Sequence, residues 1–126
     1  MADKIFYDVQ CMNPHVKIVC GSFAPNGSSA VDSASNEGTG WSVARSGTGS
    51  FTVTLDANYP ALLSGQCSLA LNAVADSKVQ FGAIDVASGK TVVINVITTA
   101  SAADIAANAN NRIHFCLFLR NTSLTK

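Results

Sequence analysis

The chain has 126 residues, of which 48% are hydrophobic and only 13% charged, and its eight basic and eight acidic residues cancel at neutral pH. This length fits a single domain with one hydrophobic core. The absence of a basic excess argues against nucleic-acid binding, because phosphate contacts require clustered lysines and arginines. No apolar run reaches the length of about 18 residues that a membrane-spanning helix needs.

The N-terminal third predicts two strands, Ile5 to Cys11 and Val16 to Phe23, joined by a turn over residues 12–15. A long polar loop follows over residues 24–39. A loop of this length is expected to be functional or to reach a neighbouring molecule. The start of the chain has no apolar segment typical of a signal peptide, so we expect synthesis in a reducing cytoplasm.

Residues 40–55 are the strongest hairpin signal in the chain. Phe51, Val53 and Leu55 alternate with serine and threonine, as in a strand with one buried face. A glycine-rich turn at 46–49 has the length expected of a hairpin connection. After it, residues 59–63 are expected to form a loop with at most a turn or two of helix.

Alternation continues over residues 67–73, and the apolar phase then reverses at Gly82. A glycine at such a reversal predicts a β-bulge or a strand that turns a barrel corner. The run from Thr91 to Thr98 is rich in β-branched residues and apolar on both faces, which indicates a central or covered strand. Residues 99–111 are expected to be a loop with little helix.

The last predicted strand runs from Arg112 to Arg120. One face carries four large apolar residues that should point inward. The other face is also largely apolar, where solvent would be expected, and this is typical of a subunit interface. The residues predicted at that interface are His114, Cys116 and Phe118.

These elements predict an all-β fold, a jelly-roll-like sandwich or barrel of about eight antiparallel strands with the long polar loop at 24–39. Residues 1–126 form one β domain. Within it, 39–126 supply the core, and 1–38 contribute the N-terminal strands and loop, which could act as an arm.

No residues in the sequence suggest catalysis. There is no nucleophile motif or carboxylate pair, and His15 and His114 are each better explained by an ordinary polar contact. A zinc site from Cys11, His15 and Cys20 matches no familiar spacing. We therefore expect no enzyme activity, no catalytic residue, no metal and no cofactor.

The four cysteines fall outside metal-binding patterns, and free, strand-packed thiols are favoured for all of them. Two disulfides, with three possible connectivities, remain the alternative. Trp41 begins an alternating strand and is expected in the core. If its ring were instead exposed, it could serve as a glycan platform in a tail-fibre or lectin-like binding module, which is the alternative function.

The segments 40–55, 59–63, 104–108 and 111–123 resemble, in pattern and texture, small β-rich virion proteins of tailed bacteriophages. The resemblance implies a capsid decoration, or cement, protein that binds as a homotrimer to the major capsid protein on the outside of the head. It implies no active site, no nucleic-acid partner and no membrane contact. In that reading the N-terminal segment or the 24–39 loop would contact the shell or a neighbouring subunit.

Overall fold

The computed structural model describes residues 15–121. Its secondary structure is almost entirely strand, with one short 3-10 helix, Ser33–Ser35. The strands are β1 (Val16–Phe23), β2 (Trp41–Gly47), β3 (Ser50–Leu55), β4 (Ala61–Ala70), β5 (Ser77–Asp85), β6 (Thr91–Thr98), β7 (Ser101–Ala102) and β8 (Arg112–Arg120).

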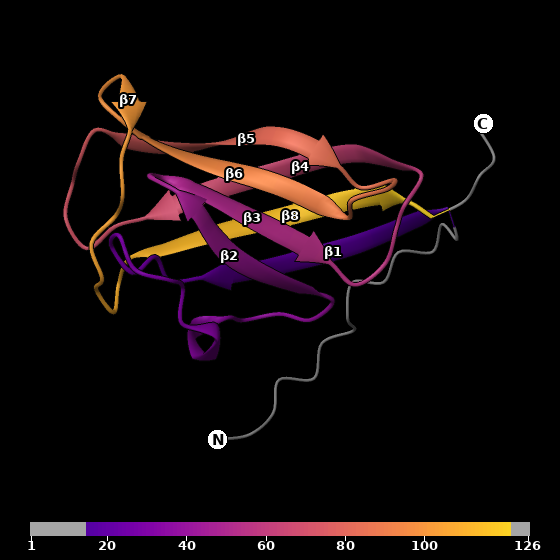
Figure 1. Ribbon diagram of the computed structural model, residues 1–126, viewed down its shortest axis with the longest axis horizontal. Coiled ribbons are helices and arrows are strands. Elements are labelled where there is room, and N and C mark those ends of the chain that lie inside the picture. The colour runs from indigo at the N-terminus through magenta and orange to yellow at the C-terminus, as the bar shows by residue number, and fades with distance from the viewer. Residues whose placement is uncertain (1–14, 122–126) are drawn as a thin grey trace, which may run out of the picture.

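The strands form two antiparallel sheets that lie in two layers (Figure 1). One sheet has three strands in the order β1-β8-β4. The other has the order β2-β3-β6-β5, with the two-residue β7 paired to the end of β6. The predicted all-β fold of about eight antiparallel strands is confirmed, and of the two expected forms it is the sandwich.

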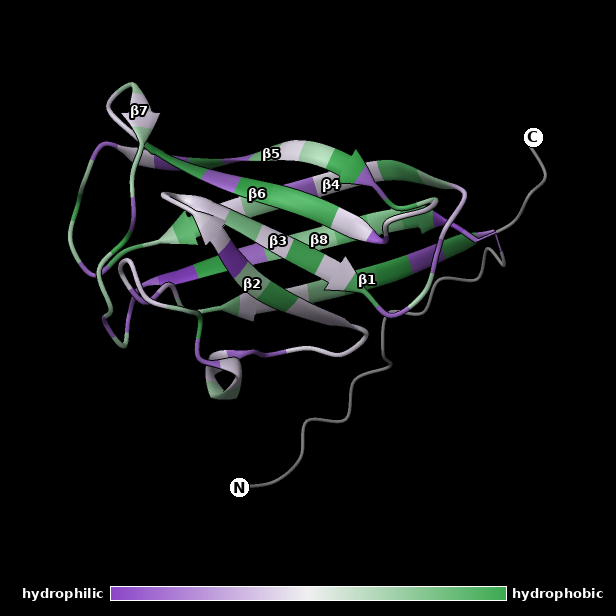
Figure 2. Ribbon diagram, viewed as in Figure 1, coloured by the Kyte–Doolittle hydropathy of each residue, from purple (hydrophilic) through white to green (hydrophobic). Residues whose placement is uncertain are grey.

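The core lies between the two sheets, because period-two alternation sends every second side chain of each strand inward. Apolar residues follow one another at this spacing along β3, β6 and β8, and Figure 2 shows the resulting hydrophobic bands. The largest fully buried side chains come from both sheets: Phe23, Phe51, Leu55, Ile94, Ile113, Leu117 and Leu119.

The strand β1 belongs to this sandwich. It pairs along its whole length with β8, and its residues Val19 and Phe23 lie in the core. The core therefore includes β1 and extends beyond the segment 39–126 expected from sequence. The predicted strand from Ile5 to Cys11 lies outside the described residues.

Three further expectations about the strands are confirmed. Residues 40–55 form the β2–β3 hairpin, with Trp41 opposite Leu55. The pairing of β5 with β6 shifts register between Phe81 and Ile84, which places the predicted bulge at Gly82. The strand β6 lies between β3 and β5, as its two apolar faces predict.

The expectation for residues 59–63 was wrong in part, since β4 already begins at Ala61. Ala61 pairs with Arg120 of β8. Pairing with a strand distant in the sequence therefore makes this short apolar segment part of the sheet. The register shifts between Leu62 and Ser64, which breaks the alternation that would have revealed the strand. Residues 99–111 form a loop that contains β7 and no helix.

The loop over residues 24–39 is held against its own domain. Ser22 and Glu37 exchange two backbone hydrogen bonds of 2.9 and 2.8 Å. The Arg112 side chain donates to the backbone oxygen of Ser35 at 2.7 Å and to the Ser22 hydroxyl at 2.9 Å. These contacts tie the C-terminal part of the loop to β1 and β8.

Candidate interaction surface

The outer face of the three-stranded sheet carries the residues predicted to form an interface. Within β8, the inward residues alternate with His114, Cys116 and Phe118, which point away from the second sheet. His114 is exposed, and Cys116 and Phe118 are half-buried. The structure therefore brings the three predicted residues together on a face that the domain's own second sheet does not cover.

The register of the sheet arranges this face in three rows. Because β8 is the central strand, each of its outward residues has one direct neighbour on β1 and one on β4. The rows, from β1 through β8 to β4, are Ile18–Phe118–Ser64, Cys20–Cys116–Gln66 and Ser22–His114–Ser68.

The rows divide the face into an apolar strip and a polar border. Ile18, Cys20, Cys116 and Phe118 form the apolar strip along β1 and β8. The β4 residues in these three rows, Ser64, Gln66 and Ser68, carry hydroxyl or amide groups, and Arg112 and Arg120 stand at the two ends of β8. An apolar centre with a polar rim is the usual anatomy of a protein–protein interface.

The outer face of the five-stranded sheet is more polar than that of the three-stranded sheet. On β3 it presents Ser50, Thr52 and Thr54, which lie opposite Asn95, Val93 and Thr91 of β6. Most of these side chains carry a hydroxyl or amide group that water can solvate. Of the two outer faces, the one built on β1 and β8 is the more apolar.

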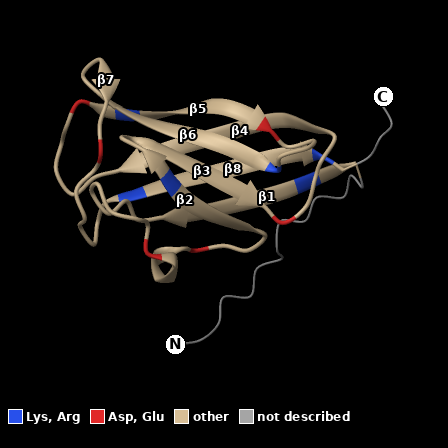
Figure 3. Cartoon of the chain, in the orientation of Figure 1, with Lys and Arg blue, Asp and Glu red and all other residues tan. Residues whose placement is uncertain are grey.

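Charged residues are sparse on both sheets. Figure 3 shows no charged residue along β3, along β6, or between the two ends of β8. A shallow hollow of about 170 Å³ lies on the outer face between β4 and β8, lined by Gln66, Cys67, Ser68, His114, Phe115 and Cys116. It contains no carboxylate and one histidine, so it offers no acid–base pair.

Two cysteines meet at the middle of the apolar strip. The Sγ atoms of Cys20 and Cys116 lie 2.6 Å apart, and both thiols are free. Burial of the thiol, together with the hydrogen bond and charge of Cys116, raises the pKa of Cys20 to about 11. Cys67 points toward the core, where burial raises the pKa of its thiol. Cys11 lies outside the described residues.

Trp41 lies in the core, as its place in the alternation predicts. It is 9% exposed, and its ring packs edge-on against Phe115 with centroids 4.8 Å apart. The backbone of Gly21 and Gly38 covers the indole, whose Nε1 is buried without a hydrogen-bond partner. A ring buried in this way has no free face on which a sugar could stack.

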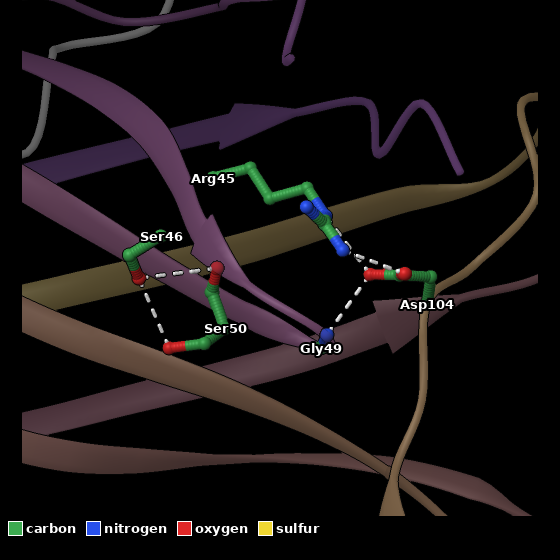
Figure 4. Close-up of polar contacts among 5 residues, drawn as sticks. All are labelled: Arg45, Ser46, Gly49, Ser50 and Asp104. Carbon is green, nitrogen blue, oxygen red and sulfur yellow. Dashed lines mark hydrogen bonds and ion pairs between the residues drawn. The ribbon is translucent and has the colours of Figure 1, made fainter. Parts of the chain in front are cut away.

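The one ion pair among the described residues joins Arg45 to Asp104 (Figure 4). Arg45 donates from Nε at 3.1 Å and from Nη2 at 2.8 Å to the two carboxylate oxygens, and the Gly49 amide donates to Oδ1 at 2.9 Å. The hydrogen bonds from Arg45 and Gly49 lower the pKa of Asp104, and that carboxylate raises the pKa of Arg45. The two side chains are only 19% and 20% exposed.

The sequence analysis did not predict this ion pair. A signal was present, because Arg45 occupies the inward phase of β2, two residues after Val43. A charged residue at an inward position predicts a charged partner. The partner itself lies 59 residues away and could not be read from local pattern.

No metal-binding group emerges from residues 15–121, where no three histidine, cysteine or acidic side chains gather. Of the three residues weighed as a zinc site, His15 precedes β1, Cys20 lies within β1, and Cys11 lies outside the described range. No helix within the same range is long and apolar enough to cross a membrane.

Comparison with protein-family models, curated proteins and solved structures finds no match to this chain.

Proposed function

We propose that this chain is a virion structural protein that decorates and stabilises a bacteriophage capsid through subunit contacts, as a homotrimer on the capsid exterior. The observation that carries the proposal is the apolar strip on the outer face of β1 and β8. The resemblance to phage virion proteins supplies the capsid partner and the threefold stoichiometry.

The strip is suited to contact between copies of the chain. Its largest side chain is Phe118, which is half-buried on a sheet face that no other layer of the described residues covers. Burial of apolar area contributes roughly 25 cal/mol per Å², part of which offsets the entropy lost on association. The zero net charge favours this contact, because little electrostatic repulsion opposes it.

Such a protein stabilises a shell by mass action and needs no chemistry. A trimer that binds only the assembled shell adds its binding free energy to the stability of that shell. The sandwich suits this role, because its hydrogen-bonded strands hold the contact face rigid. The glycan-binding alternative receives no support from Trp41, whose ring is in the core.

The oligomeric part of the proposal is tested with Phe118→Ser. Light scattering coupled to size exclusion should give a trimer for the wild type and a smaller species for the variant. Val93→Ser is the matched control, since Val93 is also half-buried but lies on the outer face of the other sheet. A wild-type chain that stays monomeric at high concentration would contradict the proposal, as would equal effects of the two substitutions.

The partner is tested with heads of the encoding phage that lack this protein. Added wild-type protein should sediment with the expanded heads and raise their dissociation temperature. The Phe118→Ser variant should bind fewer heads and raise that temperature less. Failure of the wild-type protein to bind the heads would overturn the capsid assignment even if the trimer forms.

A further inference from the structure

We infer that Cys20 and Cys116 form a cross-strand disulfide that covalently joins β1 to β8. The inference rests on the register and contact of these two residues and not on the proposed function. It replaces the expectation of four free thiols for this one pair.

The backbone places the two cysteines correctly for such a bond. Cys20 and Cys116 are direct partners in the antiparallel pairing of β1 with β8. Directly opposed residues in antiparallel strands have Cα atoms about 4.5 to 5.5 Å apart, within the range of about 4.4 to 6.8 Å that a disulfide requires. Neither strand would have to move for the bond to form.

The side chains already meet. The Sγ–Sγ separation of 2.6 Å exceeds a disulfide bond length by only about half an ångström. Both side chains are on the outer face, where a small oxidant can reach them, and Cys20 is exposed. Cys67 lies on the inner side of β4, so it has no part in this pair.

Glutathione disulfide is a sufficient oxidant. One cysteine thiolate attacks it, which releases a glutathione thiolate and leaves a mixed disulfide on the protein. The other cysteine thiolate then attacks the protein sulfur of that mixed disulfide and releases the second glutathione thiolate. The protein loses two protons and two electrons, and one glutathione disulfide becomes two glutathione thiols.

The bond would have a large structural effect, because β1 is an edge strand and β8 is its one sheet neighbour among residues 15–121. The two cysteines are 96 residues apart, so the cross-link closes almost the whole described chain into a loop. Long closed loops are the case in which a disulfide most restricts the unfolded state.

The sequence makes the test direct, because trypsin places each cysteine on a separate peptide. Cys20 falls on 18–45, Cys67 on 46–78, Cys116 on 113–120 and Cys11 on 5–17. The full chain is equilibrated in glutathione buffers, starting from both the oxidised and the reduced protein. Free thiols are then alkylated, and the peptides are identified by mass spectrometry without reduction.

We expect peptides 18–45 and 113–120 to be recovered as one linked species while Cys67 is alkylated. In urea the equilibrium preference for this link should fall by about 100-fold, since folding no longer holds the thiols together. Oxidation should raise the Tm of the folded protein by about 10 °C.

Cys67→Ser is the matched control and should leave both the linked peptides and the rise in Tm unchanged. Cys20→Ser and Cys116→Ser should each abolish both. The inference is overturned if Cys20 and Cys116 remain alkylated in excess glutathione disulfide, if they carry glutathione without linking, or if a non-reducing gel shows that the link joins two chains. These outcomes are independent of whether the protein forms trimers or binds phage heads.

Discussion

Close packing around Trp41 depends on two glycines that lack a side chain. The indole lies against the backbone of β1 at Gly21, where a β-carbon would overlap its ring atoms. Gly38 meets the same ring from the loop and has a φ of 119°, which side-chain-bearing residues rarely adopt. Glycine at position 21 therefore allows the largest aromatic residue of the chain to be buried beside an edge strand.

Gly21→Ala is expected to lower the free energy of unfolding by about 1 to 3 kcal/mol, because the indole must move out of a packed core. Urea unfolding followed by Trp fluorescence measures the change and reports on the environment of Trp41. Gly47→Ala is the control, since a β-carbon there meets no atom within 4 Å. Similar losses in the two variants would show that the cost comes from the strand backbone and not from the indole.

The ion pair of Arg45 with Asp104 connects the 99–111 loop to the β2–β3 hairpin. The carboxylate accepts from the Arg45 side chain and from the Gly49 amide, which lies in the turn of that hairpin. Gly49 has a φ of 60° and packs against the backbone of Ala103, so the turn and the loop approach closely. One side chain thus connects two segments far apart in the sequence.

Asp104→Asn is expected to lower the Tm by about 5 °C at pH 7, because the neutral amide weakens the charge-assisted hydrogen bonds. The folded-state pKa of Asp104 is lowered, so its stabilising contribution is complete above the unfolded pKa of about 3.9. As the pH falls through the folded pKa, that contribution is lost. Thermal scans from pH 7 to pH 2 should therefore show the two proteins converging at the acidic end.

Asp56→Asn provides the control for this pH series. Asp56 is exposed, and its side chain has no hydrogen-bond partner among residues 15–121. Its substitution should change the Tm little at any pH. A gap between wild type and Asp104→Asn that stays constant down to pH 2 would rule out the ionised carboxylate as its cause.

For the whole molecule, the distribution of charge and apolar surface governs how copies associate. The net charge is zero. The central strand of the three-stranded sheet, β8, carries no charged residue between its two ends. The arginines stand at the ends of that strand, at the border of the apolar strip. Association through this face should depend on apolar burial and hardly on ion pairs.

The association constant is therefore expected to change less than about threefold between 0.1 and 1 M sodium chloride, because salt screens charges and leaves apolar contacts intact. Sedimentation equilibrium at several concentrations measures it. Dissociation at high salt would instead show that association depends on ion pairs of the arginines at the ends of β8 or of Lys17. Arg120→Gln would then separate those possibilities.

The sequence by itself determined the elements whose pattern is local. Alternation located β3 and β8 to the residue, because each side chain's face follows from a period of two along its own strand. The same alternation showed that His114, Cys116 and Phe118 share one face. The phase reversal at Gly82 located the bulge of β5 for the same reason.

Only the tertiary structure decided which strands are neighbours. The start of β4 at Ala61 depends on its pairing with β8, and the partner of Arg45 lies in a distant loop. The meeting of Cys20 with Cys116 depends on the register of strands at opposite ends of the described chain. Register follows from the fit of both sheets around one core, and no single segment of sequence contains that information.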